Sequence, residues 1–275
     1  MTYIFHIPYP EDIDKEDFSG LFNALELEGI EEGELHLSIY ITEQGVEEAE
    51  PYIKEVCDNF DTSYEKTILE NKNWNEQWER SFQPLLIDDF VLVRATFHPE
   101  NRAVEHEIII EPKMSFGTGH HPTTAQMMQQ MRLLDFKGKK VLDCGSGTGI
   151  LAVLAEKMGA SSCIALDNDT WCYENCRENI VLNSASVVQP VLGEINQFLG
   201  DTFDSVLANI HRNFLLEYMD VLASILKKDG CLLISGFYSE DAKLILDKAM
   251  SYGLSATYRT SSNNWDCILL KKSSE

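Results

Sequence analysis

The stretch "VLDCGSGTGIL", residues 141–151, decides the fold of this 275-residue chain. An apolar run ends in the acid Asp143, three glycines follow at every second position, and an apolar helix-like run begins at Ile150. Glycines allow the backbone to adopt dihedral angles that a Cβ atom forbids and to approach a ligand closely. In open α/β sheets, ligands bind beyond the carboxyl ends of the strands. The stretch therefore predicts a ligand-binding turn between a parallel strand and a helix.

The glycine spacing limits the class of ligand. A P-loop requires a lysine and then a serine or threonine after its last glycine, and "GTGIL" has neither. A dinucleotide-binding turn requires G-x-G-x-x-G, and its third glycine would fall on Ile150. The remaining pattern, G-x-G-x-G preceded by an acid, is typical of methyltransferases that bind S-adenosylmethionine, a ligand without phosphates. Asp167, at the end of the next predicted strand, can accept both hydroxyls of a ribose.

The chain after residue 125 repeats this alternation of strand and helix. Regular alternation of apolar strands with helices predicts a parallel sheet covered on both faces, an α/β doubly wound fold. The last segments, "SATYRT" and "WDCILLKK", are separated by "SSNN" and predict an antiparallel β-hairpin that closes the sheet. Further strands are expected at 139–145, 162–169, 186–193, 205–210 and 231–237, with helices at 150–160, 170–183, 213–228 and 239–253.

The first seventy residues predict a separate α+β unit. A strand at 2–7 precedes an amphipathic helix at 14–29, a poor strand at 29–33 and a strand in which Leu35 to Ile41 alternate with polar residues. A second helix around Ile53 and a last strand complete the order βαββαβ, that of a ferredoxin-like module. We therefore expect a small ferredoxin-like domain over residues 1–70.

A connecting segment is expected over residues 71–100, before the main domain at 101–275. Trp74, Trp78 and Phe82 lie four residues apart, so a linker helix would set them on one stripe for packing onto the second domain. "DDFVLVRATF" and "HEIIIEP" predict a pair of strands that leads into the polar loop "MSFGTGHHPTT".

The composition restricts the partners. With 22 basic and 45 acidic residues the net charge is −23, which repels nucleic acid and anionic membranes and attracts basic proteins or amines. No signal peptide or membrane-spanning stretch is recognisable, and seven scattered cysteines indicate reduced thiols, so a cytoplasmic and monomeric protein is expected.

The motifs together resemble one family. "FGTGHHPTT" (116–124), the glycine stretch, "ALDND" (165–169), "ANI" (208–210) and "LLISGF" (232–237) are similar to the bacterial methyltransferases of ribosomal large-subunit protein eleven. The opening nonapeptide is the most diagnostic piece, because generic methyltransferases lack it. The resemblance implies a Rossmann-like class I methyltransferase sheet, a ferredoxin-like domain that recognises the ribosomal protein, and N-methylation of its lysine or amino groups. The chain departs from the family at His120, in "GSGTG" and in "IHRNF" after Asn209.

The resemblance also implies the site residues. S-adenosyl-L-methionine would be bound by Phe116, Thr124, Gly145, Gly147, Asp167 and Asn209, and Asn209 would also orient the acceptor amine as the catalytic residue. Each residue has a simpler interpretation as well: Thr124 is also a good helix N-cap, and Asn209 could bond only to backbone. The pair His120–His121 has the wrong spacing for a metal site, and no metal is expected.

Other functions remain open at this point. The nearest is an N-methyltransferase that acts on another protein or a small amine. A non-catalytic cofactor-binding scaffold would be expected to have a degraded glycine turn or to lack Asp167, and both are intact here. A dehydrogenase is disfavoured by Ile150.

Overall fold

The computed structural model describes residues 2–10, 13–22, 25, 27–33, 35–68, 82–100, 104–111, 113 and 115–273. The chain divides into two compact units, Met1–Ser81 and Phe82–Glu275. The linker helix predicted across Trp74 and Trp78 falls outside the described residues, and the predicted domain boundaries at 70 and 100 stay predictions. Among the described residues, no helix is long and apolar enough to cross a bilayer.

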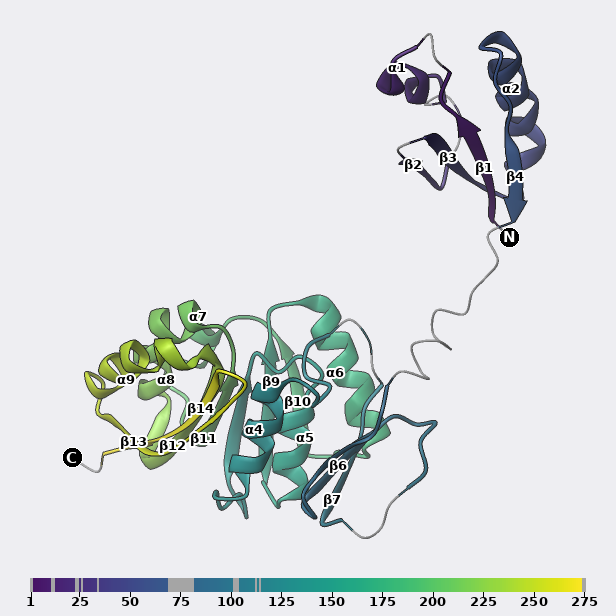
Figure 1. Ribbon diagram of the computed structural model, residues 1–275. Coiled ribbons are helices and arrows are strands. Elements are labelled where there is room, and N and C mark those ends of the chain that lie inside the picture. The colour runs from purple at the N-terminus through teal and green to yellow at the C-terminus, as the bar shows by residue number, and fades with distance from the viewer. Residues whose placement is uncertain are drawn as a thin grey trace. The chain divides into compact units, whose positions relative to one another are not determined.

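The first unit is a four-stranded antiparallel sheet with two helices (Figure 1). Its strand order is β2-β3-β1-β4, so β3 lies between β1 and β2 as in a ferredoxin-like module. The βαββαβ order predicted for this part is the observed one. Its elements are β1 (Thr2–Pro8), α1 (Lys15–Gly20), β2 (Gly29–Glu32), β3 (His36–Thr42), α2 (Val46–Asn59) and β4 (Glu65–Ile68).

Two details of this unit differ from the prediction. Leu35 precedes β3 and is 81% exposed, so the buried alternation begins only at Leu37. Helix α1 ends at Gly20, because glycine destabilises a helix, and the next turns continue as i→i+3 hydrogen bonds from Leu21 and Phe22. Phe22 still enters the core of the unit, so the apolar spacing predicted burial better than helix length.

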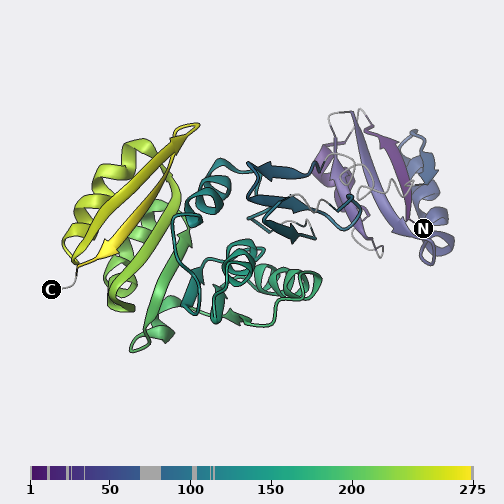
Figure 2. The same cartoon turned by 90° about the horizontal axis from the view of Figure 1, so that it is seen from below.

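A seven-stranded sheet forms the centre of the second unit, in the order β10-β9-β8-β11-β12-β14-β13 (Figures 1 and 2). The five strands from β10 to β12 are parallel, and β14 runs antiparallel to both of its neighbours. Because the chain moves outward from β8 in opposite directions, a crevice opens at its carboxyl end. The strands are β8 (Lys140–Cys144), β9 (Ser162–Asp167), β10 (Val188–Leu192), β11 (Phe203–Asn209), β12 (Leu226–Tyr238), β13 (Leu254–Ser262) and β14 (Trp265–Lys272).

Helices cover both faces of this sheet and bury two separate cores. Val141 and Leu142 are neighbours on β8 and face opposite cores, as the alternation of a strand requires. One face is covered by α4 (Pro122–Met131), α5 (Ile150–Lys157) and α6 (Thr170–Leu182), and the other by α7 (Arg212–Glu217), α8 (Met219–Ser224) and α9 (Ala242–Met250). Short 3₁₀ turns lie at Ile195–Phe198 and Ser239–Asp241.

The helix predicted over 213–228 is wrong in two respects. It breaks at Tyr218, whose backbone leaves the helical region, and it stops at Ser224. Leu226 and the two lysines after it belong to β12, because Leu226 pairs with Phe203 at the start of β11. The predicted hairpin is confirmed. Asn263 and Asn264 both have positive φ, as the two-residue turn between twisted antiparallel strands requires.

A small three-stranded sheet precedes the polar loop. It consists of β5 (Leu85–Ile87), β6 (Val91–Arg94) and β7 (His106–Ile109), and β6 and β7 are parallel. The sequence predicted a strand pair here, and β5 is an addition to that pair. Val93 and Ile108 pack into the same core as α4 and α5, so this sheet holds the start of the loop against the main domain.

Candidate active site

The glycine turn joins β8 to α5 and is crowded on every side. Gly145, Gly147 and Gly149 all have positive φ, between 52° and 77°. A Cβ atom on Gly147 would overlap the carbonyl oxygen of Phe116, and one on Gly145 would lie 2.9 Å from Ile210 Cδ1. Glycine is therefore required both by the backbone angles and by the close approach of neighbouring segments.

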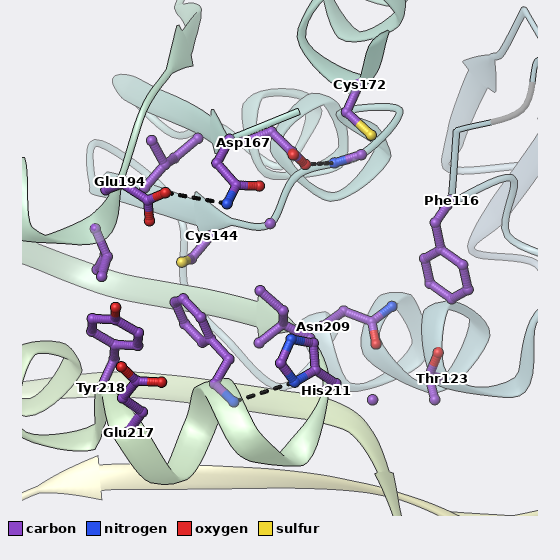
Figure 3. A pocket seen from close by; sticks show the side chains of 18 of the residues that line it. Phe116, Thr123, Cys144, Asp167, Cys172, Glu194, Asn209, His211, Glu217 and Tyr218 are labelled. Carbon is purple, nitrogen blue, oxygen red and sulfur yellow. Dashed lines mark hydrogen bonds between the residues drawn. The ribbon is translucent and has the colours of Figure 1, made fainter. Parts of the chain in front are cut away.

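Asp167 ends β9 beside this turn. Its Oδ2 accepts a hydrogen bond from the Gly147 N–H at 2.8 Å (Figure 3). Its Oδ1 accepts one from the Asp169 N–H at 3.1 Å. Each carboxylate oxygen retains a lone pair after these bonds. Asp167 therefore both fixes the glycine turn and keeps acceptor capacity for a ligand.

A cavity of about 660 Å³ lies beyond the carboxyl ends of β8, β9 and β11 (Figure 3). Its described lining includes the acids Asp167, Glu194 and Glu217 and contains no lysine or arginine. Three acids without a cationic side chain in the described lining disfavour a phosphate ligand by charge repulsion. The acids suit a ligand with positive charge. The remaining lining residues are Phe116, His121, Thr123, Cys144, Gly145, Gly147, Leu166, Asn168, Cys172, Gly193, Ile195, Asn209, Ile210, His211, Phe214, Tyr218, Gly236 and Trp265.

Asn209 ends β11 and borders the cavity, and only one of the two polar atoms of its side-chain amide is hydrogen-bonded. Its Nδ2 donates to Thr124 Oγ1 at 3.1 Å, whereas its Oδ1 is buried and has no hydrogen-bond partner. A buried carbonyl oxygen without a partner is rare in proteins and is expected where a ligand supplies the missing donor. The Oδ1 of Asn209 therefore retains its capacity to accept a hydrogen bond.

Thr124 lies behind Asn209 and not in the cavity wall. Both Thr123 and Thr124 are buried, and Thr123 is the one that belongs to the described cavity lining. Thr124 is not the helix N-cap either, because α4 begins at Pro122 and the ring of His121 accepts the capping hydrogen bond from the Thr123 N–H. Proline is favoured at such a first helical position. The other five predicted site residues, Phe116, Gly145, Gly147, Asp167 and Asn209, line the one cavity together.

Three neighbouring aromatic rings, those of Phe116, His121 and Trp265, form an aromatic wall of the cavity. His121 lies 5.3 Å from Phe116 and 4.9 Å from Trp265, measured between ring centroids, and Trp265 lies 4.1 Å from Tyr238. Burial lowers the pKa of His121 and so favours the neutral form of its ring. His120 instead contacts Phe82 and the Gln83 carbonyl oxygen, so the two adjacent histidines point to different partners.

Sequence reasoning missed several lining residues. Glu194 follows β10 closely, and a polar residue just after a parallel strand could have been predicted to lie at the ligand site, as Asp167 was. Trp265 and His121 meet only in the folded chain, and no local pattern connects them. Among the described residues, no group of three or more histidine, cysteine, aspartate or glutamate side chains could hold a metal ion.

Comparison with known proteins agrees with this geometry. A sequence model of the ribosomal protein L11 methyltransferase (PrmA) family matches residues 12–273. A ribosomal protein L11 methyltransferase of Porphyromonas gingivalis is 46% identical over 208 residues, which are 74% of this chain and 71% of that protein. One of Phocaeicola vulgatus is 42% identical over 226 residues, 80% of each chain. A ribosomal protein L11 methylase of Lactobacillus delbrueckii subsp. bulgaricus, 23% identical, shares the fold with a TM-score of 0.64 over 70% of this chain and 100% of that one. The chain belongs to the ribosomal protein L11 methyltransferase family.

Proposed function

We propose that this protein transfers methyl groups from S-adenosyl-L-methionine to lysine or amino groups of ribosomal protein L11. The relatives at 46% and 42% identity are named as methyltransferases of that protein. The observation that carries the proposal is the cavity itself, in which a glycine turn and Asp167 meet two further acids with no cationic side chain in the described lining. A sulfonium donor and an amine acceptor both fit such a lining.

Gly145, Gly147 and Asp167 would hold the donor. The bare backbone of the turn allows close approach, and the remaining lone pairs of Asp167 can accept the two ribose hydroxyls. Phe116, which is 52% exposed, would cover the bound cofactor from the loop side. When bound, the cofactor supplies a methyl group attached to a positively charged sulfur, and the neutral thioether is a good leaving group. The protein then has mainly to align the acceptor with that methyl group.

Asn209 would orient the acceptor amine. A neutral amine has N–H donors, and the unpartnered Oδ1 of Asn209 can accept one while Thr124 holds the other end of the amide. A lysine must first lose a proton, which costs about 4.6 kcal/mol at pH 7 from its reference pKa. Desolvation between the aromatic wall and Ile210 favours the neutral amine, so a dedicated base is not required.

The charge of the chain supports a basic protein partner. A net charge of −23 attracts a cationic ribosomal protein and disfavours direct binding of nucleic acid, although screening limits its range to roughly 10 Å in physiological salt. We propose that the protein acts as a monomer in the cytoplasm and methylates L11 that is not bound to RNA.

The test is incubation with labelled S-adenosylmethionine and either purified L11 or other ribosomal proteins. We expect label on L11, and Asn209→Ala should lower turnover about a hundredfold, the usual effect of misplacing a reacting group. Asn213→Ala is the matched control, because Asn213 is exposed on α7. Label only on other substrates would assign a different acceptor, and a protein that binds the cofactor without labelling anything would be a scaffold. Near-normal turnover in Asn209→Ala would refute the role of Asn209.

A further inference from the structure

Helix α6 and its C-cap carry three asparagines at four-residue spacing, Asn175 and Asn179 in the helix and Asn183 at the cap. This spacing places them on one face of the helix. Asn175 is 2% exposed and Asn179 is fully buried, and most buried amide groups in proteins are hydrogen-bonded. The partners of this face therefore show what it holds.

The asparagine face binds the outer edge of β7 and its continuation. The Ile109 N–H donates to Asn183 Oδ1 at 2.9 Å, and Asn183 Nδ2 donates back to the Ile109 carbonyl at 2.6 Å. The Glu111 N–H donates to Asn179 Oδ1 at 2.8 Å, and the Glu111 carbonyl accepts from Asn175 Nδ2 at 3.2 Å. The residue between them, Ile110, bonds in the opposite direction to β6. The amides thus replace a neighbouring strand along this edge.

Asn179 also bonds the glycine turn. Its Nδ2 donates to the carbonyl oxygen of Thr148 at 2.9 Å. Thr148, fully buried, in turn donates from its N–H to the Phe116 carbonyl at 3.0 Å and from its hydroxyl to the Gly117 carbonyl at 2.6 Å. One amide therefore connects the segment that enters the polar loop, at Glu111, with the turn on which that loop lies. Asn179 itself is not among the described residues of the cavity wall.

We propose that Asn179 is a positioning residue for cofactor binding. Its side chain fixes the position of the Glu111 backbone relative to that of Thr148. Thr148 then holds the backbone of Phe116 and Gly117 against the glycine turn through its two hydrogen bonds. The packing of α6 onto the core is provided by other residues, Cys176 and Ile180. The inference rests on the proposed cofactor role of this loop, and it assigns a function to hydrogen bonds that lie outside the cavity.

The test compares Asn179→Leu, which has a similar volume and no amide, with Ile180→Ala on the same helix. Asn179→Leu should weaken S-adenosylmethionine binding, measured by calorimetry, about tenfold, as expected for the loss of one or two hydrogen bonds. The KM for the cofactor should rise in parallel while kcat at saturation stays near the wild-type value. In the ligand-free protein, hydrogen exchange should accelerate at Glu111 and Thr148. Ile180→Ala should lower Tm and leave the Kd unchanged.

A second variant keeps the proposal testable if Asn179→Leu does not fold. Thr148→Val removes only the hydroxyl bond to Gly117 and should raise the Kd severalfold. An unchanged Kd in this variant, or in a folded Asn179→Leu protein whose Tm falls like that of Ile180→Ala, would overturn the proposal. Failure of the wild-type protein to bind S-adenosylmethionine would instead overturn the proposed function, so the two failures are distinguishable.

Discussion

Substitution of Gly147 by alanine should separate backbone strain from ligand binding. Gly147 has a φ of 52°, and an L-residue in this region costs roughly 1–2 kcal/mol. The added Cβ would also overlap the Phe116 carbonyl oxygen, so the loop must move away from the turn. That movement breaks the two hydrogen bonds that Thr148 gives to the loop, at 3.0 and 2.6 Å. Two such bonds contribute about 2 kcal/mol, or roughly thirtyfold in affinity.

Gly138→Ala provides a control with the same kind of backbone strain and no contact. Gly138 has a φ of 71°, and nothing lies within 4 Å of the position its Cβ would take. Thermal melting and calorimetry with S-adenosylmethionine should show a lower Tm in both variants and about thirtyfold weaker binding only in Gly147→Ala. Equal cofactor affinity in the two variants would refute the argument that the loop and the glycine turn form one binding surface.

Two further predictions concern buried polar groups. Thr124→Val should lower the single-turnover methylation rate about tenfold and leave the Kd for the cofactor unchanged, because the Asn209 amide loses its acceptor; an unchanged rate would contradict the role of Thr124 behind Asn209. Burial raises the pKa of Asp143 from 3.8 to about 7, so the folded protein retains a proton that the unfolded chain releases, and the stability contributed by this group falls as pH rises from about 4 to about 7. Asp143→Asn should remove this pH dependence. In denaturant titrations, the free energy of unfolding of the variant relative to wild type should rise by at most about 4 kcal/mol between pH 4 and pH 8. Parallel pH profiles of the two proteins would contradict this prediction.

Local sequence patterns predicted much of the fold and five of the residues that line the candidate site. Strands β9 and β11 end in Asp167 and Asn209, and in a parallel sheet such ends converge at one edge. The glycine spacing predicted backbone dihedral angles that a Cβ atom forbids, and the positive φ angles of Gly145, Gly147 and Gly149 confirm them. These features depend on residues near one another in sequence, so a single sequence contains the information.

The parts that were missed depend on pairing across the chain. The parallel alignment of β6 with β7 and the contact of His121 with Trp265 join segments that no periodicity connects. The position of Thr124 behind Asn209 follows from where helix α4 begins. Because α4 begins at Pro122, Thr123 reaches the cavity and Thr124 turns toward Asn209. Element boundaries within one or two residues thus decide which side chain touches a ligand.

The position of β14 has a consequence for biosynthesis. This strand follows every other strand in chain order, yet it lies between β12 and β13 and bonds to both. A nascent chain cannot bring β13 into the sheet until Trp265–Lys272 has left the exit tunnel. Since Trp265 also lines the cavity, that part of the cavity wall forms only when β14 has joined the sheet, after the glycine turn and the strands that carry Asp167 and Asn209 have been synthesised.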